Sequence, residues 1–282
     1  MCLMDVCWFG SWPSQCALLN SIDFLQVSMA CVKISAICPI QVLERVSDQL
    51  RWQHVNKDFK LPWKQDVIPI LAEGSPTYQT VSQPETLTKE EGDLLVLAHE
   101  RLSKLCQECE SEGICLLVDA EYSSIQPAID YIINVAACKF NKGDHPLVYS
   151  TLQTYLKDSF QRLNLAVKGS HERGLSYGVK IVRGAYILRE KALAASLQAP
   201  SPIHSNIEET HRCYNSCAAF MLEQVSSGNA SVVVATHNMA SGMKPIFSFK
   251  TRKHTLIYIS YMGLQNLSLH AWYFCGNTDC FQ

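Results

Sequence analysis

The stretch VKIVRGAY, residues 179–186, decides the fold. Residues 179–182 are apolar except for one lysine, which is typical of a strand buried in a parallel sheet. Because side chains alternate across a strand, we expect Lys180 to point away from Ile181. A buried cation is costly unless it meets an anion or an electron-rich ligand. Lys180 therefore indicates a binding site on one face of this strand.

The end of the same strand favours a phosphate group. Arg183 offers a guanidinium, and Gly184 lets a ligand approach the backbone closely. Exposed backbone N–H groups beside an arginine are typical of anion sites. A strand end closed by a salt bridge is the alternative.

Four more short apolar runs predict further strands, at 31–37 (CVKISAI), 114–118 (ICLLV), 147–152 (LVYSTL) and 231–235 (SVVVA). Between the strands, apolar residues recur at helical spacing, which predicts helices over 41–54, 88–112, 155–173 and 205–226. Two of these helices begin with capping-box patterns, Thr88–Glu91 and Ser205–Glu208. Three are followed by a glycine of the kind that ends helices: Gly113, Gly174 and Gly228. The proline-rich segment 56–86 is expected to be an extended loop.

Alternating strands and helices predict an α/β protein with a parallel sheet. The glycine-rich turn of dinucleotide-binding folds is absent after the first strand. Polar residues end nearly every predicted strand: Lys33, Asp119, Gln153, Lys180, Arg183, Thr236 and His237. In a TIM barrel these ends converge on one mouth, whereas an open sheet would scatter them. We therefore expect an incomplete (βα)8 barrel with about five of its βα units present.

The composition excludes several classes of protein. Hydrophobic residues make up 48% of the 282 residues and charged residues 18%, which excludes disorder and collagen-like structure. The net charge of −2 lacks the excess of positive charge that is typical of proteins that bind nucleic acid. The 13 cysteines are not spaced as in a small secreted scaffold, so we expect free thiols in a reduced compartment.

Asp119 is the first candidate for chemistry, since it directly follows a buried strand in VDAE (118–121). The alternative role, capping the next helix, suits Glu121 better. Lys33 resembles Lys180 in being a lysine among apolar neighbours, so both are expected to be buried beside anionic partners. Those partners would be a substrate carboxylate and a cofactor phosphate or flavin ring. The amide of Gln153 suits the edge of a heterocycle.

No metal site is expected. The pairs Cys106–Cys109 and Cys213–Cys217 lie in predicted helices, where packing in the core explains thiols better than zinc binding does. His204 and His211 flank the start of a helix and are expected on the surface. His237 is a lone histidine at a strand end, and its position is compatible with a structural role as well as with a functional one.

Several motifs together resemble the proline dehydrogenase family, in its plant-like mitochondrial form. They are CVKISAICPIQVLERVSD (31–48), LLVDAE (116–121), QPAIDY (126–131), TLQTYLKD (151–158), VKIVRGAY (179–186) and ATHN (235–238). The resemblance runs from about Met29 to Gly242, and the order of the motifs makes it specific.

The resemblance implies an FAD-dependent (βα)8 barrel in mitochondria. Such an enzyme oxidises L-proline to 1-pyrroline-5-carboxylate and passes the electrons to a quinone of the inner membrane. The resemblance also implies that the enzyme associates peripherally with this membrane. Asp119 and Lys180 would be catalytic, and Lys33, Asp119 and Tyr186 would bind the substrate. The implied FAD contacts are Ala120, Gln153, Lys180, Arg183, Gly184, Ala185, Thr236 and His237.

The two ends of the chain depart from the family pattern. Residues 1–28 lack the basic residues of a transit peptide, and 244–282 lack the expected further strands and paired arginines. We therefore divide the chain into a partial barrel at 29–243 and unmatched segments at 1–28 and 244–282. The uncharged stretch 254–278 is long enough to span a bilayer, although its polar residues favour a packed or misplaced segment. Hydroxyproline dehydrogenase and an inactive barrel fragment remain alternative functions.

Overall fold

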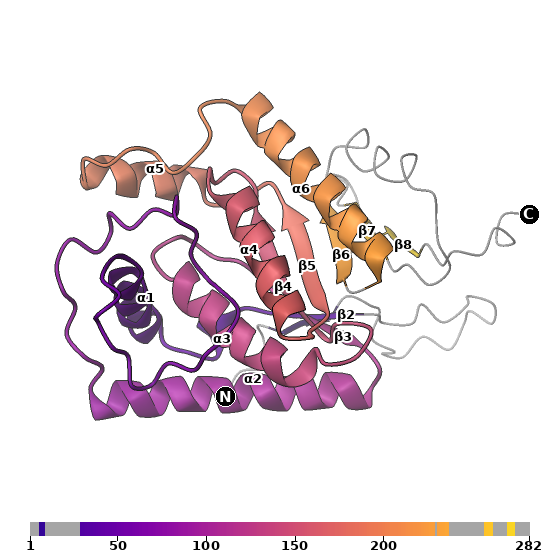
Figure 1. The fold of residues 1–282 in the computed structure, drawn as a ribbon, viewed down its shortest axis with the longest axis horizontal. Helices are drawn as coiled ribbons and strands as arrows, with labels where there is room; N and C mark the ends of the chain where they lie inside the picture. Colours follow the sequence, from indigo (N-terminus) through magenta and orange to yellow (C-terminus); the bar gives the residue numbers. More distant parts are fainter. Residues whose placement is uncertain (1–5, 9–28, 229, 237–256, 262–269, 274–282) are drawn as a thin grey trace, which may run out of the picture.

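The computed structural model describes residues 6–8, 29–228, 230–236, 257–261 and 270–273 (Figure 1). His237, one of the predicted FAD contacts, lies outside these residues, as do most of the segments 1–28 and 244–282.

One sheet carries the eight strands of the described residues, and they lie side by side in sequence order. The strands from β2 to β7 are parallel, and β1 and β8 pair antiparallel at the two edges. The strands are β1 (Val6–Trp8), β2 (Met29–Val32), β3 (Cys115–Val118), β4 (Val148–Gln153), β5 (Tyr177–Val182), β6 (Ala230–Ala235), β7 (Ile257–Tyr261) and β8 (His270–Tyr273). Parallel strands in sequence order, joined by helices, confirm the prediction of an incomplete α/β barrel.

The helices fall where helical spacing predicts them, with two further helices in addition. They are α1 (Ile40–Val55), α2 (Lys89–Ser111), α3 (Gln126–Phe140), α4 (Ser159–Glu172), α5 (Ile187–Ser196) and α6 (Ile207–Ser227). The Thr88–Glu91 capping box at the start of α2 is confirmed. The box predicted at Ser205–Glu208 is wrong by one residue, because the Asn206 side chain accepts the Glu209 N–H and begins α6.

One face of the sheet packs against the helices, and the other faces the interior of the barrel. Residues of one parity in each strand, such as Val32, Val118 and Ile181, pack under the helices in two large apolar clusters. In Figure 1, α3, α4 and α6 lie in front of the strands, and α2 runs along the lower edge of the view. Residues of the other parity face the barrel interior, where a small cluster that includes Leu117 and Tyr149 fills the space between strands. A single helix-covered face is typical of a barrel, because a doubly wound sheet is covered on both faces.

The first parallel strand is shorter than predicted. β2 ends at Val32, and the short 3-10 helix η1 (Ile34–Ala36) follows it. The carboxylate of Glu121 accepts hydrogen bonds from Ser35 N at 3.1 Å and Ser35 Oγ at 2.7 Å, which stabilises this turn. Glu121 therefore caps η1, and the expectation that it caps the helix after it is wrong. Lys33 is exposed at the strand end, so the prediction that it is buried is also wrong.

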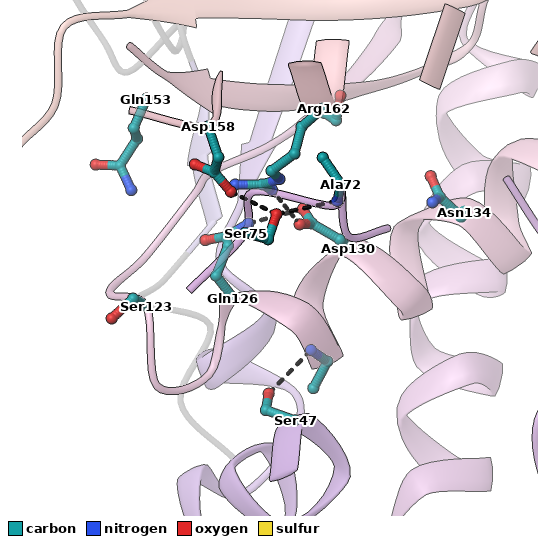
Figure 2. Close-up of polar contacts among 12 residues, drawn as sticks. Ser47, Ala72, Ser75, Ser123, Gln126, Asp130, Asn134, Gln153, Asp158 and Arg162 are labelled. Carbon is teal, nitrogen blue, oxygen red and sulfur yellow. Dashed lines mark hydrogen bonds and ion pairs between the residues drawn. The ribbon is translucent and has the colours of Figure 1, made fainter. Parts of the chain in front are cut away.

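The 56–86 segment contains no helix or strand, as predicted, and polar contacts fasten it to the barrel. Ser75 Oγ accepts from Ala72 N at 3.0 Å and donates to Asp158 Oδ2 at 2.6 Å, which ties the segment to the start of α4 (Figure 2). Beside this contact, Arg162 of α4 forms an ion pair of 2.5 Å with Asp130 of α3. The segment is thus a fixed part of the helix layer.

The expectation that residues 244–282 lack further strands is wrong, because β7 and β8 lie there. β7 and β8 lie within the uncharged stretch 254–278, and β7 adds a sixth parallel strand beside β6. No helix in the described ranges combines the length and the apolar character needed to cross a bilayer.

Candidate functional site

A cavity of about 780 Å³ opens at the carboxyl ends of strands β2 to β6. Its lining includes every predicted site residue that the structure describes: Lys33, Asp119, Ala120, Gln153, Lys180, Arg183, Gly184, Ala185, Tyr186 and Thr236. The remaining lining residues are Thr151, Val182, His211 and Ala235. The strand residues in this lining alternate along each strand with the residues that pack under the helices. They therefore point into the barrel.

An ion pair lies inside the cavity. Lys180 Nζ donates to Asp119 Oδ1, although Lys180 lies in β5 and Asp119 directly follows β3, with β4 between these strands. Their side chains are 17% and 28% exposed, so both charges are partly withdrawn from water. The protein thus supplies the anion that a lysine at this position requires. A ligand in the cavity would meet Asp119 and Lys180 as one unit.

The Gln153 side chain joins two loops across the cavity. Its Nε2 donates to Glu121 O at 2.7 Å, and its Oε1 accepts from Ala185 N at 3.2 Å. The amide is buried. One N–H and one lone pair remain for a heterocycle, fewer than the sequence alone suggested.

Arg183 is held in a fixed orientation at the edge of the cavity. It donates from Nη1 to Thr236 Oγ1 at 2.6 Å and from Nε to His211 Nδ1 at 2.9 Å. Its guanidinium carbon lies 4.2 Å from the centre of the Tyr214 ring, as in a cation–π contact. Burial lowers the pKa of Arg183 below its usual value.

His211 is a residue that the sequence analysis missed. It was expected on the surface, and that prediction is wrong, because it lines the cavity and accepts the hydrogen bond from Arg183. Its position in the first turns of α6 gave no signal in the sequence, since α6 meets β5 only in the folded chain.

Gly184 has a backbone conformation that other residues rarely adopt, with φ at +137°. A Cβ at this position would lie 1.6 Å from Tyr155 Cδ1. The structure therefore explains this glycine first by the close approach of a buried tyrosine ring. A contact between Gly184 and a ligand remains a prediction.

The loop after β3 is held against Tyr186 and the start of α5 beside the cavity. Ser123 donates from N and Oγ to the two carboxylate oxygens of Glu190, at 2.7 and 2.5 Å. Tyr122 packs edge-on against Tyr186 at 6.0 Å between ring centroids. Arg189 lies 3.5 Å over the Tyr122 ring. Burial raises the pKa of Tyr186, so its hydroxyl remains protonated at neutral pH.

The cavity fits a large cofactor that carries negative charge. Its volume lies in the range of cofactor sites, roughly 300–1,000 Å³. Three cations, Lys33, Lys180 and Arg183, line it together with one carboxylate, that of Asp119. No group of three or more His, Cys, Asp or Glu side chains within the described residues is arranged to hold a metal ion.

The fold and the site together define a barrel of the (βα)8 type with its ligand cavity at the carboxyl ends of the strands. The family model described as proline dehydrogenase matches residues 15–262. The chain belongs to the proline dehydrogenase family. This match is wider than the 29–243 unit predicted from the sequence, whose boundaries stay a prediction.

Similarity to individual proteins agrees with the family. The chain is 49% identical to proline dehydrogenase 2, mitochondrial, of Arabidopsis thaliana over 218 residues, covering 77% of this chain and 46% of that protein. It is 34% identical to human hydroxyproline dehydrogenase over 228 residues, covering 79% of this chain and 48% of that protein. The chain thus spans about half the length of these curated relatives.

A solved structure shares the fold. The crystal structure of proline utilization A from Bdellovibrio bacteriovorus, inactivated by N-propargylglycine, aligns with a TM-score of 0.53 at 18% identity. The alignment covers 79% of this chain and 24% of that protein. At this identity the similarity supports the fold alone.

Proposed function

We propose that the protein serves in the FAD-dependent oxidation of L-proline to 1-pyrroline-5-carboxylate, the first step of proline degradation. The observation that carries this proposal is the cavity in which the described residues matching the family motifs meet around Asp119 and Lys180. Membership of the family supports proline as the substrate. The mitochondrial names of the plant relatives support a place in mitochondria. A position in the matrix or on the inner membrane, and a membrane quinone as electron acceptor, belong to the proposal through the resemblance of the motifs alone.

FAD, when bound, supplies the acceptor for the hydride that leaves C5 of proline. Lys33, exposed at the mouth, attracts the carboxylate of the incoming substrate. The Asp119 carboxylate holds the Lys180 ammonium over the cavity, where a fixed cation stabilises negative charge that develops on the ring of the cofactor. Tyr186 forms part of the wall that shields the reacting ring from water.

The proposed cofactor contacts divide into two groups by their chemistry. Arg183 and Thr236, which are already joined to each other, suit the phosphate groups. Ala120, Gln153, Gly184 and Ala185 also line the cavity and suit the flat ring. His237 belongs to this set by its motif alone.

The purified chain should be yellow, with a flavin spectrum that L-proline bleaches in the absence of oxygen. Lys33→Ala and Asp119→Ala should abolish the bleaching and retain the flavin, whereas Arg183→Ala should release flavin on gel filtration. A colourless wild-type protein would favour the alternative of a barrel fragment without catalysis.

A second substrate is favoured by the 34% identity to human hydroxyproline dehydrogenase. Bleaching by 4-hydroxyproline and not by L-proline would replace proline as the substrate and leave the proposed oxidation chemistry intact.

A further inference from the structure

A second cleft lies outside the barrel mouth and shares no residue with the cavity described above. Its volume is about 680 Å³, and it is formed by the end of α1, residues 57–71 and Leu165 of α4. Four basic side chains line it: His54, Lys57, Lys60 and Lys64. We call it the lysine cleft.

Basic side chains outnumber acidic ones in the lining of the lysine cleft. The only acidic residue in its lining is Asp66, whose two carboxylate oxygens are bound by Arg173 Nη2 at 3.0 and 3.1 Å. Within the part of the chain that the structure describes, no carboxylate forms an ion pair with Lys57, Lys60 or Lys64. Three ammonium groups therefore share one cleft with a single carboxylate, which Arg173 already binds.

The charge of Lys57 acts on two neighbouring bases in the cleft. Burial lowers the pKa of Lys64, the charge of Lys57 lowers it further, and Asp66 acts in the opposite direction. Burial also lowers the pKa of His54, with Lys57 again the next cause. An anion in the cleft would relieve this repulsion, because opposite charge within a few ångströms favours the protonated form of a base.

The backbone that presents the lysines is fixed. Gln53 donates from Nε2 to Phe59 O at 3.0 Å and accepts from Lys64 Nζ at 2.5 Å. The Tyr131 hydroxyl accepts from Gln65 N at 3.0 Å, and Asn134 donates to Ile68 O at 3.1 Å. A site held in this way loses less conformational entropy when a ligand binds.

The wall of the cleft adds an apolar surface beside the charges. Its half-buried apolar members are Ile70, Leu71 and Leu165. A ligand that fits both surfaces has a compact anionic group and an apolar part next to it.

We propose that the lysine cleft binds a multivalent phosphoryl anion, with the phosphates between Lys57, Lys60 and Lys64. Lysine binds phosphate as a point charge, and contacts of this kind weaken as salt screens them. A free phosphate compound and the head group of an anionic phospholipid share this chemistry.

The test uses the full chain and does not depend on flavin or on turnover. Pyrophosphate is titrated calorimetrically into the wild type, into Lys57→Gln/Lys60→Gln/Lys64→Gln, and into the matched control Lys89→Gln/Lys104→Gln/Lys142→Gln. The control loses the same charge at exposed lysines elsewhere on the surface. Wild type and control should show one saturable site that weakens with salt, and the first triple variant should bind at least about tenfold more weakly.

A parallel arm measures co-sedimentation with phosphatidylcholine vesicles that contain or lack phosphatidic acid, whose head group is a phosphomonoester. Saturable pyrophosphate binding assigns the cleft to free phosphate compounds. Binding to the anionic vesicles alone, lost in the cleft variant and kept in the control, assigns it to a lipid head group. Absence of binding in both arms, or equal binding by the two triple variants, overturns the proposal, whatever the outcome of the flavin experiment.

Discussion

Replacing Gly184 by alanine should lower the free energy of unfolding more than the same change at other glycines with positive φ. At Gly184 the new Cβ would lie 1.6 Å from Tyr155 Cδ1 and 2.0 Å from Cε1. The Tyr155 ring is 1% exposed, so packed neighbours resist its displacement. Two costs therefore add: strain at a φ of +137° and overpacking of the core.

The size of the effect follows from these two costs. Holding a residue with a side chain in a sparsely populated backbone region costs about 1–3 kcal/mol. Overpacking a well-packed core costs about 1–3 kcal/mol more. We expect Gly184→Ala to lower the free energy of unfolding by about 2–6 kcal/mol.

Gly228→Ala is the matched control. Gly228 has a φ of +98°, and a Cβ added there would meet no atom within 4 Å, so this variant carries backbone strain without a clash. Urea unfolding followed by circular dichroism gives both free energies. Adding Tyr155→Ala to each variant should then remove part of the cost of Gly184→Ala and none of the cost of Gly228→Ala. Equal destabilisation by the two glycine changes, or no coupling with Tyr155, would refute the explanation.

Two further predictions concern a buried base and a buried acid. Burial lowers the pKa of His99 from 6.5 to about 4. The unfolded chain therefore takes up a proton below pH 6.5 that the native state refuses, and stability should fall by about 2 kcal/mol from pH 7 to pH 5. His99→Phe, which keeps a ring against Tyr131, should remove most of this loss in urea unfolding at the two pH values; an unchanged loss would assign it to other groups. Glu190→Ala removes the acceptor of two Ser123 hydrogen bonds and should cost about 2–5 kcal/mol in the same assay, more than Glu190→Gln; equal costs would contradict this reasoning, because glutamine keeps one acceptor oxygen for Ser123 and alanine keeps none.

Much of the helix layer could be predicted from local patterns. The extents of α1, α2, α4 and α6 follow from apolar residues at helical spacing, and the glycines after α2, α4 and α6 have the positive φ expected at helix ends. α3 was not predicted, because ten of its residues are buried and its apolar residues are not confined to one stripe. α5 was not predicted because it is short and has only two buried residues.

The candidate site was predicted largely by its place in the strand pattern. The parity rule put Lys180 opposite Ile181, and the structure confirms this: Ile181 packs under the helices, whereas Lys180 lines the cavity. The burial of Lys33 was wrong, because the length of β2 depends on pairing with β3 and on the Glu121 cap, which no local pattern encodes.

The sequence by itself determined the class of fold, the family and the strand ends that carry the polar residues. These features depend on side-chain alternation, helical spacing and glycine positions, all of which act within a few residues. Tertiary structure alone decided that Asp119 pairs with Lys180, that His211 orients Arg183 and that Tyr155 packs against Gly184. Each of these contacts joins segments far apart in the chain, and its geometry is set by strand register and by helix packing over the whole sheet.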